Sequence, residues 1–213
     1  ERVEQLHGEL IELVAESDDT LLEKFFEQGG LSEEEMRAGI HKAVQEQVFV
    51  PVFFTAAEQN VGVARIMDFI AKYASSPADS KEVKGVDPKE QEISVSVEDS
   101  ELSAFVFKTV SEQHLGDLSF VKVRSGTLNM GDDVRNEGRQ SNERIGQVFI
   151  LNGKNREKIE ALGAGDIGAL VKLKHTHTGD TLSSVKRPVV FPPIEYPLPN
   201  IHSALQSKSK GDE

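Results

Sequence analysis

Apolar side chains recur at helical spacing through the first third of the chain. The first such pattern predicts a helix with one apolar face, formed by Val3, Leu6, Leu10, Leu13 and Val14. A second helix is expected between the capping residues 17–19 and the glycine pair 29–30. A third is expected after Ser32, which forms a capping box with Glu35. Such faces are typical of ordinary core packing, so the helices alone indicate no function.

The next pattern is a strand followed by a helix. Residues 48–54 are β-rich and apolar on both faces, which predicts a strand buried between helices in a parallel sheet. Pro51 cannot donate a ladder hydrogen bond, so it places this strand at a sheet edge or at a strand start. Residues 62–73 predict a helix, and the two elements together make half of a βαβ unit.

After residue 75 the sequence first becomes polar and aperiodic and then shows short alternating runs. Residues 75–99 are polar, contain two prolines and lack a period, so we expect a linker there. Short alternating runs then occur at 104–107, 121–124 and 167–174, in which Ile167, Ala169 and Val171 are expected to share one face. Gly-Asp pairs punctuate the runs at 116–117, 131–132, 165–166 and 179–180. This pattern of short strands separated by turns predicts a small closed antiparallel barrel.

Two segments of this part are less regular. Residues 155–162 are expected to form a short helical or irregular excursion, and the proline-rich tail from Pro188 is expected to run extended. The pentad 178–182, Thr-Gly-Asp-Thr-Leu, is interpreted as a structural turn that closes the barrel. A barrel of this kind predicts a binding module rather than a catalyst.

Composition narrows the class of protein. The chain has 213 residues, 38% of them hydrophobic and 28% charged, as expected for a soluble globular protein of one large or two small domains. It contains no apolar run of about 18 residues and no secretory leader, so neither a membrane span nor a membrane partner is expected. Cysteine is absent, which excludes disulfides and thiolate chemistry and fits a cytoplasmic protein. The chain starts at Glu1 rather than Met, so we expect a piece of a longer protein.

The net charge of −12 is unevenly distributed. Residues 101–190 contain 13 Lys and Arg against 11 Asp and Glu, whereas the rest contains 11 against 25. The acidic part repels nucleic acid at long range, and the barrel part is able to approach phosphates. A simply solubilising surface explains the same numbers.

A search for catalytic and metal motifs finds none. The chain has no GxxxxGK[ST] phosphate loop, no GxGxxG, no NKxD and no GxSxG, and its carboxylates are scattered. We therefore expect no catalytic residue in this chain. His175 and His177 would face one side of a strand, as two metal ligands do, but no further ligand completes a site and we expect no metal.

Four basic residues are the candidates for a binding surface. They alternate with the apolar positions of their strands and are therefore expected to project outward: Lys122, Arg124, Lys172 and Lys174. Outward Lys and Arg on a rigid barrel position a protein on a nucleic-acid backbone without reading its sequence. Ordinary solubilising charge remains the alternative.

The order of these segments resembles elongation factor G, a translational GTPase, or a close paralogue. Residues 103–108, 116–128, 131–132, 164–167 and 178–182 resemble successive strands and turns of that family's domain II. Residues 18–35 resemble the segment after its inserted G-prime subdomain, and 51–63 resemble the last strand, the guanine-contacting loop and the closing helix of its G domain. Residues 196–199 and 207–210 resemble the start of domain III.

The resemblance implies an α+β, multi-domain chain: a helical C-terminal portion of a P-loop GTPase domain followed by an antiparallel β-barrel. The implied boundaries are 1–76 for the G-domain part, 77–100 for a linker, 101–190 for domain II and 191–213 for the extended start of domain III. Implied partners are the rest of the G domain, domain III and the ribosome, whose small-subunit RNA domain II would touch through the four basic residues.

The resemblance also implies a nucleotide site that this chain holds only in part. Thr55, Ala56 and Ala57 are the guanine-loop candidates, and Ala56 stands where the family usually has Ser. Backbone N–H groups meet the guanine carbonyl there, which Ala still supplies, and Thr55 offers the hydroxyl. GTP and Mg²⁺ are expected in the full-length protein, but none is expected on this chain, because phosphoryl transfer requires the phosphate loop and switch regions.

Three functions stay open on these residues. The first is GTP-dependent movement of tRNA and mRNA on the ribosome. The second is a ribosomal protection or ribosome-recycling GTPase, which shares this part of the chain. The third is a stand-alone barrel that binds RNA or protein without a nucleotide, although aromatic residues for base stacking are not interleaved with its basic positions.

Overall fold

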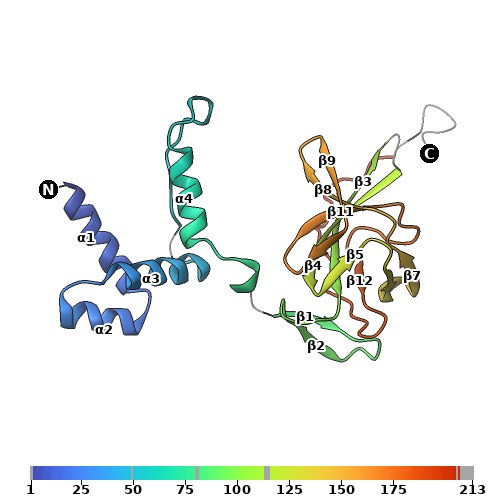
Figure 1. Ribbon diagram of the computed structural model, residues 1–213, viewed down its shortest axis with the longest axis horizontal. Coiled ribbons are helices and arrows are strands. Elements are labelled where there is room, and N and C mark those ends of the chain that lie inside the picture. Colours follow the sequence, from blue (N-terminus) through green and yellow to red (C-terminus); the bar gives the residue numbers. More distant parts are fainter. Residues whose placement is uncertain (1, 49, 80–81, 113–115, 205, 207–213) are drawn as a thin grey trace. The chain divides into compact units, whose positions relative to one another are not determined.

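The computed structural model describes residues 2–48, 50–79, 82–112, 116–204 and 206 and divides the chain into two compact units. Residues 1–80 form the helical unit and residues 81–213 form the β unit (Figure 1).

The helical unit contains the expected helices. They are α1 (Arg2–Ala15), α2 (Asp19–Gln28), α3 (Glu33–Gln45) and α4 (Val63–Tyr73), with 3₁₀ turns η1 (Ala57–Gln59) and η2 (Pro77–Asp79). Val14, Ala15, Ile40 and Ala43 are its buried apolar residues. Gly39 lets α1 and α3 approach, because a Cβ at this position would lie 2.5 Å from Val14 Cγ1.

Side-chain caps fix where α2 and α3 begin. The Asp18 carboxylate accepts a hydrogen bond from the backbone N–H of Thr20 at 2.9 Å and pairs with Lys42 of α3. The predicted capping box is present, since Glu35 N–H donates to Ser32 Oγ and Ser32 N–H donates to Glu35 Oε2. These contacts satisfy backbone donors that a helix start leaves free.

The strand predicted at 48–54 was wrong. No strand is assigned to residue 48 or to residues 50–55, and Val50, Val52 and Phe54 have exposed fractions of 78%, 75% and 94%. A strand forms only beside another strand, and among the described residues of this unit the only pairing is the short bridge of Ala56 with Val61. The run has the composition of a buried strand without the neighbours that would bury it.

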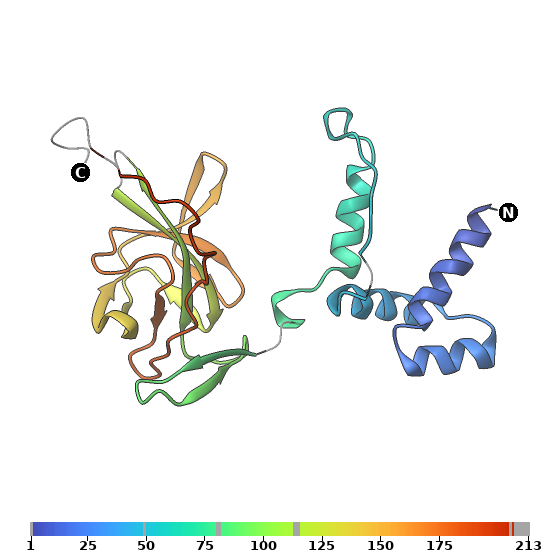
Figure 2. The ribbon, with the colours of Figure 1, turned by 180° about the vertical axis from the view of Figure 1, so that it is seen from behind.

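Eight strands of the β unit form one antiparallel sheet. They are β3 (Ser103–Glu112), β4 (Gly116–Ser125), β6 (Asp133–Asn136), β7 (Ser141–Arg144), β8 (Val148–Asn152), β9 (Asn155–Ile159), β11 (Ile167–Val171) and β12 (Thr181–Ser183). Their order is β7-β6-β12-β3-β4-β11-β8-β9, and β5 (Thr127–Asn129) pairs separately with β10 (Ala161–Gly163). The strands curve around a shared interior in both views (Figure 2).

The predicted closed barrel is not found. Among the described residues β7 and β9 are the two edges of the sheet, and no pairing joins them. The sheet instead wraps around one apolar cluster, which includes Val106, Val121, Val123, Leu128, Leu162, Leu170 and Leu182. Burial of this cluster, rather than an uninterrupted ring of hydrogen bonds, holds the unit together.

Strand β11 is apolar on both faces, which the alternation did not predict. Leu170 faces the main cluster, whereas Ala169 and Val171 pack with Leu118 in a second cluster on the other side of the sheet. Ile167, expected to face inward with them, is 55% exposed. β4 likewise contributes to both clusters, because hydrophobic residues cover each face of the sheet at this point.

Three segments differ from their sequence-based expectations. The expected linker 77–100 contains a hairpin of β1 (Val83–Val86) and β2 (Glu92–Val95), and Val95 is buried with Val189 and Phe191 of the tail. The prediction of a short helical or irregular segment at 155–162 was wrong, because these residues form β9 and the start of β10. The tail is extended as expected, but residues 196–199 form no strand and 207–210 lie outside the described residues.

Gly126, in the turn from β4 to β5, provides a test of the backbone constraint. It has φ +65°, and an added Cβ would lie 2.7 Å from the carbonyl carbon of Glu101 and from the nitrogen of Leu102. We expect Gly126→Ala to lower the free energy of unfolding by about 2 kcal/mol more than Gly153→Ala, because overpacking adds about 1–3 kcal/mol to the left-handed strain. Gly153 is the matched control, since it has φ +58° and open space around it. Urea unfolding measures both, and equal losses would contradict the close approach.

Two caps predict how the helical unit responds to acid. Hydrogen bonds from Lys42 and Thr20 hold the pKa of the Asp18 carboxyl well below its ordinary value, and those from Lys24 and Ser32 lower the pKa of Glu35 to about 2. A carboxyl with a depressed folded-state pKa stabilises the fold above its unfolded-state pKa and loses this effect as pH falls. Circular dichroism at about 222 nm should therefore lose helical signal between roughly pH 4.5 and pH 2.

The variant Asp18→Asn separates charge from capping in that experiment. Asn still caps a helix but cannot pair with Lys42, so the variant should melt at a lower temperature at neutral pH and depend less on acid. Glu12→Gln on α1 is the control, and an identical acid profile in both variants would show that the cap charge has no role.

Candidate functional site

The predicted guanine-loop residues lie on an exposed loop of the helical unit. Ala56 and Val61 exchange backbone hydrogen bonds of 3.1 and 3.0 Å, and residues 57–59 form the turn η1 between them. Gly62 takes φ +78° and leads directly into α4. Thr55, Ala56 and Ala57 are all exposed, so their assignment to a nucleotide stays a prediction.

Lys122 and Arg124 lie on β4 but are only partly exposed. Lys122 is placed between Phe105 of β3 and Ile167 of β11 in the register of the sheet. The Nε of Arg124 is buried and has no hydrogen-bond partner among the described residues, and burial lowers the pKa of its guanidinium. Arg124 is therefore less accessible than the outward projection predicted from the sequence.

Lys172 and Lys174 are exposed, but not on a strand as predicted. β11 ends at Val171, and Lys172 takes a left-handed backbone with φ +62° that breaks the ladder. The chain then runs as a loop, residues 172–180, to β12. Because Lys122 pairs with the first residue of β11 and Lys172 follows its last, the two lysines lie at opposite ends of this strand. The four basic residues thus do not form one stripe.

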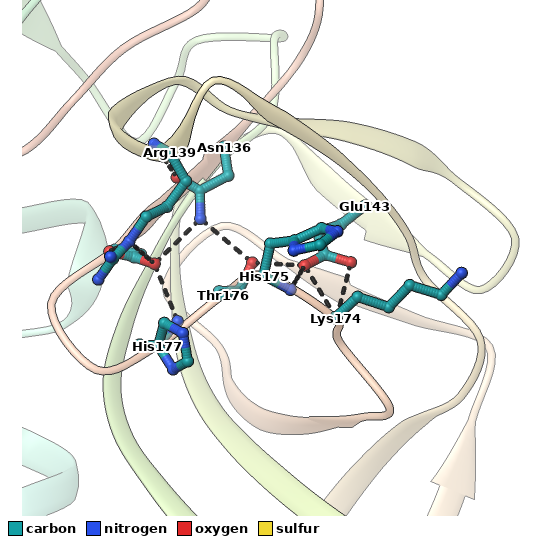
Figure 3. Close-up of polar contacts among 8 residues, drawn as sticks. Asn136, Arg139, Glu143, Lys174, His175, Thr176 and His177 are labelled. Carbon is teal, nitrogen blue, oxygen red and sulfur yellow. Dashed lines mark hydrogen bonds and ion pairs between the residues drawn. The ribbon is translucent and has the colours of Figure 1, made fainter.

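The loop 172–180 is held from beneath by a buried carboxylate, Glu143 of β7 (Figure 3). Glu143 accepts hydrogen bonds from the backbone N–H of Lys174 at 3.0 Å and of His175 at 2.6 Å, and from Thr176 Oγ1 at 3.0 Å. Three donors on one carboxylate offset the cost of burying its charge. This contact fixes the path of the loop on which Lys174 and both histidines stand.

A second carboxylate, Asp180, organises the other end of the loop. It accepts hydrogen bonds from Asn136 Nδ2 at 3.1 Å, from Arg139 Nε at 3.1 Å and from the backbone N–H of His177 at 2.8 Å. Asn136 is fully buried and also donates to Thr176 Oγ1 at 3.2 Å, so the two carboxylates are joined through this pair. Figure 3 shows the resulting chain of contacts.

A hollow of about 420 Å³ lies over this network. It is lined by Arg139, Ser141, Lys174, His175 and His177. Within the described part of the chain, no group of three or more His, Cys, Asp or Glu side chains is placed to hold a metal ion. The lining is thus rich in hydrogen-bond donors and cations, and it suits an anion better than a cation.

The sequence reasoning missed most of this site. It singled out Lys174, His175 and His177, but not Arg139, Ser141 or the buried Glu143. The one local signal is Asp180 three residues after His177, a spacing at which a carboxylate accepts from a backbone N–H. Nothing local marks Glu143, because its partners are more than 30 residues away.

Part of the chain is similar in sequence to a known protein family, and most of it is similar in fold to a solved structure. The family model of elongation factor G domain 2 matches residues 101–185, which include β3 to β12 and the whole loop 172–180. A crystal structure of a protein from Thermus thermophilus matches 94% of this chain with a TM-score of 0.75 and 24% identity, a likeness of fold. This chain spans 28% of the length of that protein.

Two further observations bear on the class of protein. In the described part of the chain no helix is long and apolar enough to cross a bilayer. The match to residues 101–185 includes the strand and turn segments between 103 and 182 whose sequence resembles domain II. Residues 101–185 therefore match elongation factor G domain 2, and most of the chain shares its fold with the protein from Thermus thermophilus.

Proposed function

We propose that this chain is part of a translation elongation factor G-like GTPase that acts on the ribosome in the cytoplasm. In this proposal the β unit is a structural and ribosome-contacting portion, and the whole protein moves tRNA and mRNA. The observation that supports it most is the match of residues 101–185 to elongation factor G domain 2.

The charge of residues 101–190, within the β unit, supports contact with RNA. Basic residues outnumber acidic ones between 101 and 190, whereas the rest of the chain is strongly acidic. Lys172 and Lys174 are exposed beyond the end of β11, and Lys122 is accessible in part on β4. Such residues place a protein on an RNA backbone through phosphate contacts and carry no sequence preference.

GTP and Mg²⁺ belong to the proposal for the whole protein. The residues here that would meet the guanine are Thr55, Ala56 and Ala57, which lie on an exposed loop. The N–H of Ala56 donates to Val61 O, so a guanine carbonyl would have to be met by other backbone N–H groups of this loop. The magnesium ion would neutralise charge on the phosphates, and the residues for that step are absent from the 213-residue sequence. We therefore expect no GTP hydrolysis by this chain alone.

Two other functions use the same observations. A ribosomal protection or ribosome-recycling GTPase shares the β unit, and the domains after it would decide between these tasks. A barrel that binds RNA or protein on its own needs no nucleotide, and the elongation factor G-like match makes it the weaker candidate. A translocation assay against a tetracycline-release assay, with the whole protein, separates the first two.

Ribosome binding by the 213-residue chain tests the proposal directly. The chain should sediment with small ribosomal subunits, and binding should weaken as salt rises. Lys122→Gln with Lys172→Gln should reduce the slope of log affinity against log salt by about 1.5 to 2, because two phosphate contacts are removed. Lys89→Gln with Lys158→Gln is the matched control, since both lysines are exposed in the same unit.

Failure of this prediction has a defined form. If the chain does not sediment with ribosomal subunits at low salt, and the whole protein shows no ribosome-stimulated GTP turnover, the proposed function is wrong. If both lysine pairs change the salt slope equally, ribosome binding is only a matter of net charge.

A further inference from the structure

We propose that the hollow over loop 172–180 is a binding site for a phosphate group. Its lining residues are Arg139, Ser141, Lys174, His175 and His177, which come from η3 (Glu137–Arg139), from β7 and from the loop. This site goes beyond the ribosomal role, because it concerns a pocket for one anion rather than a surface along an RNA chain.

The acidic groups of this region are already occupied by donors of the protein. Glu143 has an exposed fraction of 3% and accepts from two backbone N–H groups and from Thr176. Asp180, whose side chain is 12% exposed, accepts from Asn136, Arg139 and the N–H of His177. The oxygens of both carboxylates are therefore engaged by donors of the protein, and the charge of Asp180 is paired with Arg139.

The groups that face the hollow are donors. Within the described residues, the side chains of Lys174, His175 and His177 take part in no hydrogen bond or ion pair, and all three residues are exposed. Arg139 uses its Nε for Asp180, and its side chain is 49% exposed. Lys offers three donors, Arg five, and each imidazole at least one, so a tetrahedral oxyanion finds partners on several sides.

Ser141 adds an observation independent of charge. Its Oγ is buried, yet it has no hydrogen-bond partner among the described residues, although it lines the hollow. A buried hydroxyl without a partner costs free energy, and a ligand oxygen that accepts its proton removes that cost. The sequence draws attention to the same place, since the spacing of His175 and His177 stands out. The backbone N–H groups of both residues hold the loop.

The test uses inorganic phosphate and the 213-residue chain labelled with ¹⁵N. Titration should shift the amide signals of residues 139, 141, 174, 175 and 177 in a saturable way, while potassium chloride of equal ionic strength should not. Lys174→Gln should weaken phosphate binding about tenfold, because one charge-assisted hydrogen bond is lost. Lys158→Gln, an exposed lysine of β9, is the control and should leave binding unchanged.

Ser141→Ala is the second variant, and it distinguishes a built pocket from a cluster of charge. It keeps every charge, so weaker phosphate binding in this variant supports the site. Absence of saturable shifts, equal shifts with chloride, or equal binding by Lys174→Gln and wild type would each overturn the proposal. Unchanged amide signals of the core strands show in each case that the variant is folded.

A second arm identifies the source of the phosphate. A short single-stranded oligoribonucleotide that competes with inorganic phosphate at the same amides places the group on an RNA backbone, and failure to compete indicates a small free anion. Either result keeps the site. Ribosome sedimentation is measured separately, so loss of the pocket and loss of the ribosomal role are distinguishable.

Discussion

The β unit depends on the pairing of β12, a strand of three residues, with β3. β12 also pairs with β6, so it joins the β3-β4-β11-β8-β9 part of the sheet to β6 and β7. The turn before it fixes this pairing: Gly179 takes φ +92°, its N–H donates to Val106 O at 2.7 Å, and Val106 N–H donates to Asp180 O at 2.9 Å. Leu182 then enters the main apolar cluster, which stabilises the strand that is otherwise too short to stand alone.

The candidate site is a consequence of the same constraint. The loop 172–180 connects β11 to β12, which returns beside β3, and Glu143 on β7 accepts from backbone N–H groups of that loop. Asp180 contributes both to the strand pairing and to the candidate site. Its backbone carbonyl accepts from Val106 of β3, and its carboxylate accepts from Asn136 and Arg139. The loop backbone is therefore held at both ends by carboxylates, while the side chains of Lys174, His175 and His177 line the hollow.

Local signals in the sequence predicted the helices and the strands β3, β4 and β11, because capping residues, turn glycines and alternation act within a few positions. Ser32 and Glu35 mark the start of α3, and Gly179 with Asp180 marks the turn before β12. Properties set by distant partners were not predictable in this way. The open edges of the sheet, the two apolar faces of β11 and the burial of Glu143 all depend on pairings across dozens of residues. Lys172 was expected on a strand, but β11 ends at Val171 and Lys172 takes a left-handed backbone that no local signal marks.

The two units differ in how far their apolar residues are covered, and this difference bears on the chemistry proposed for each. In the β unit the large apolar residues of β4 and β11 are mostly buried, so a pocket on its surface has a fixed frame. In the helical unit Val50, Val52 and Phe54 are exposed, and the hydrogen bonds described for the loop at Thr55 to Ala57 are local ones, in the bridge of Ala56 with Val61 and in the turn η1. Backbone N–H groups bind a base well only when their positions are fixed beforehand. The nucleotide role of that loop therefore requires a neighbouring strand beside residues 50–54, whereas the phosphate site of the β unit requires nothing beyond its own fold.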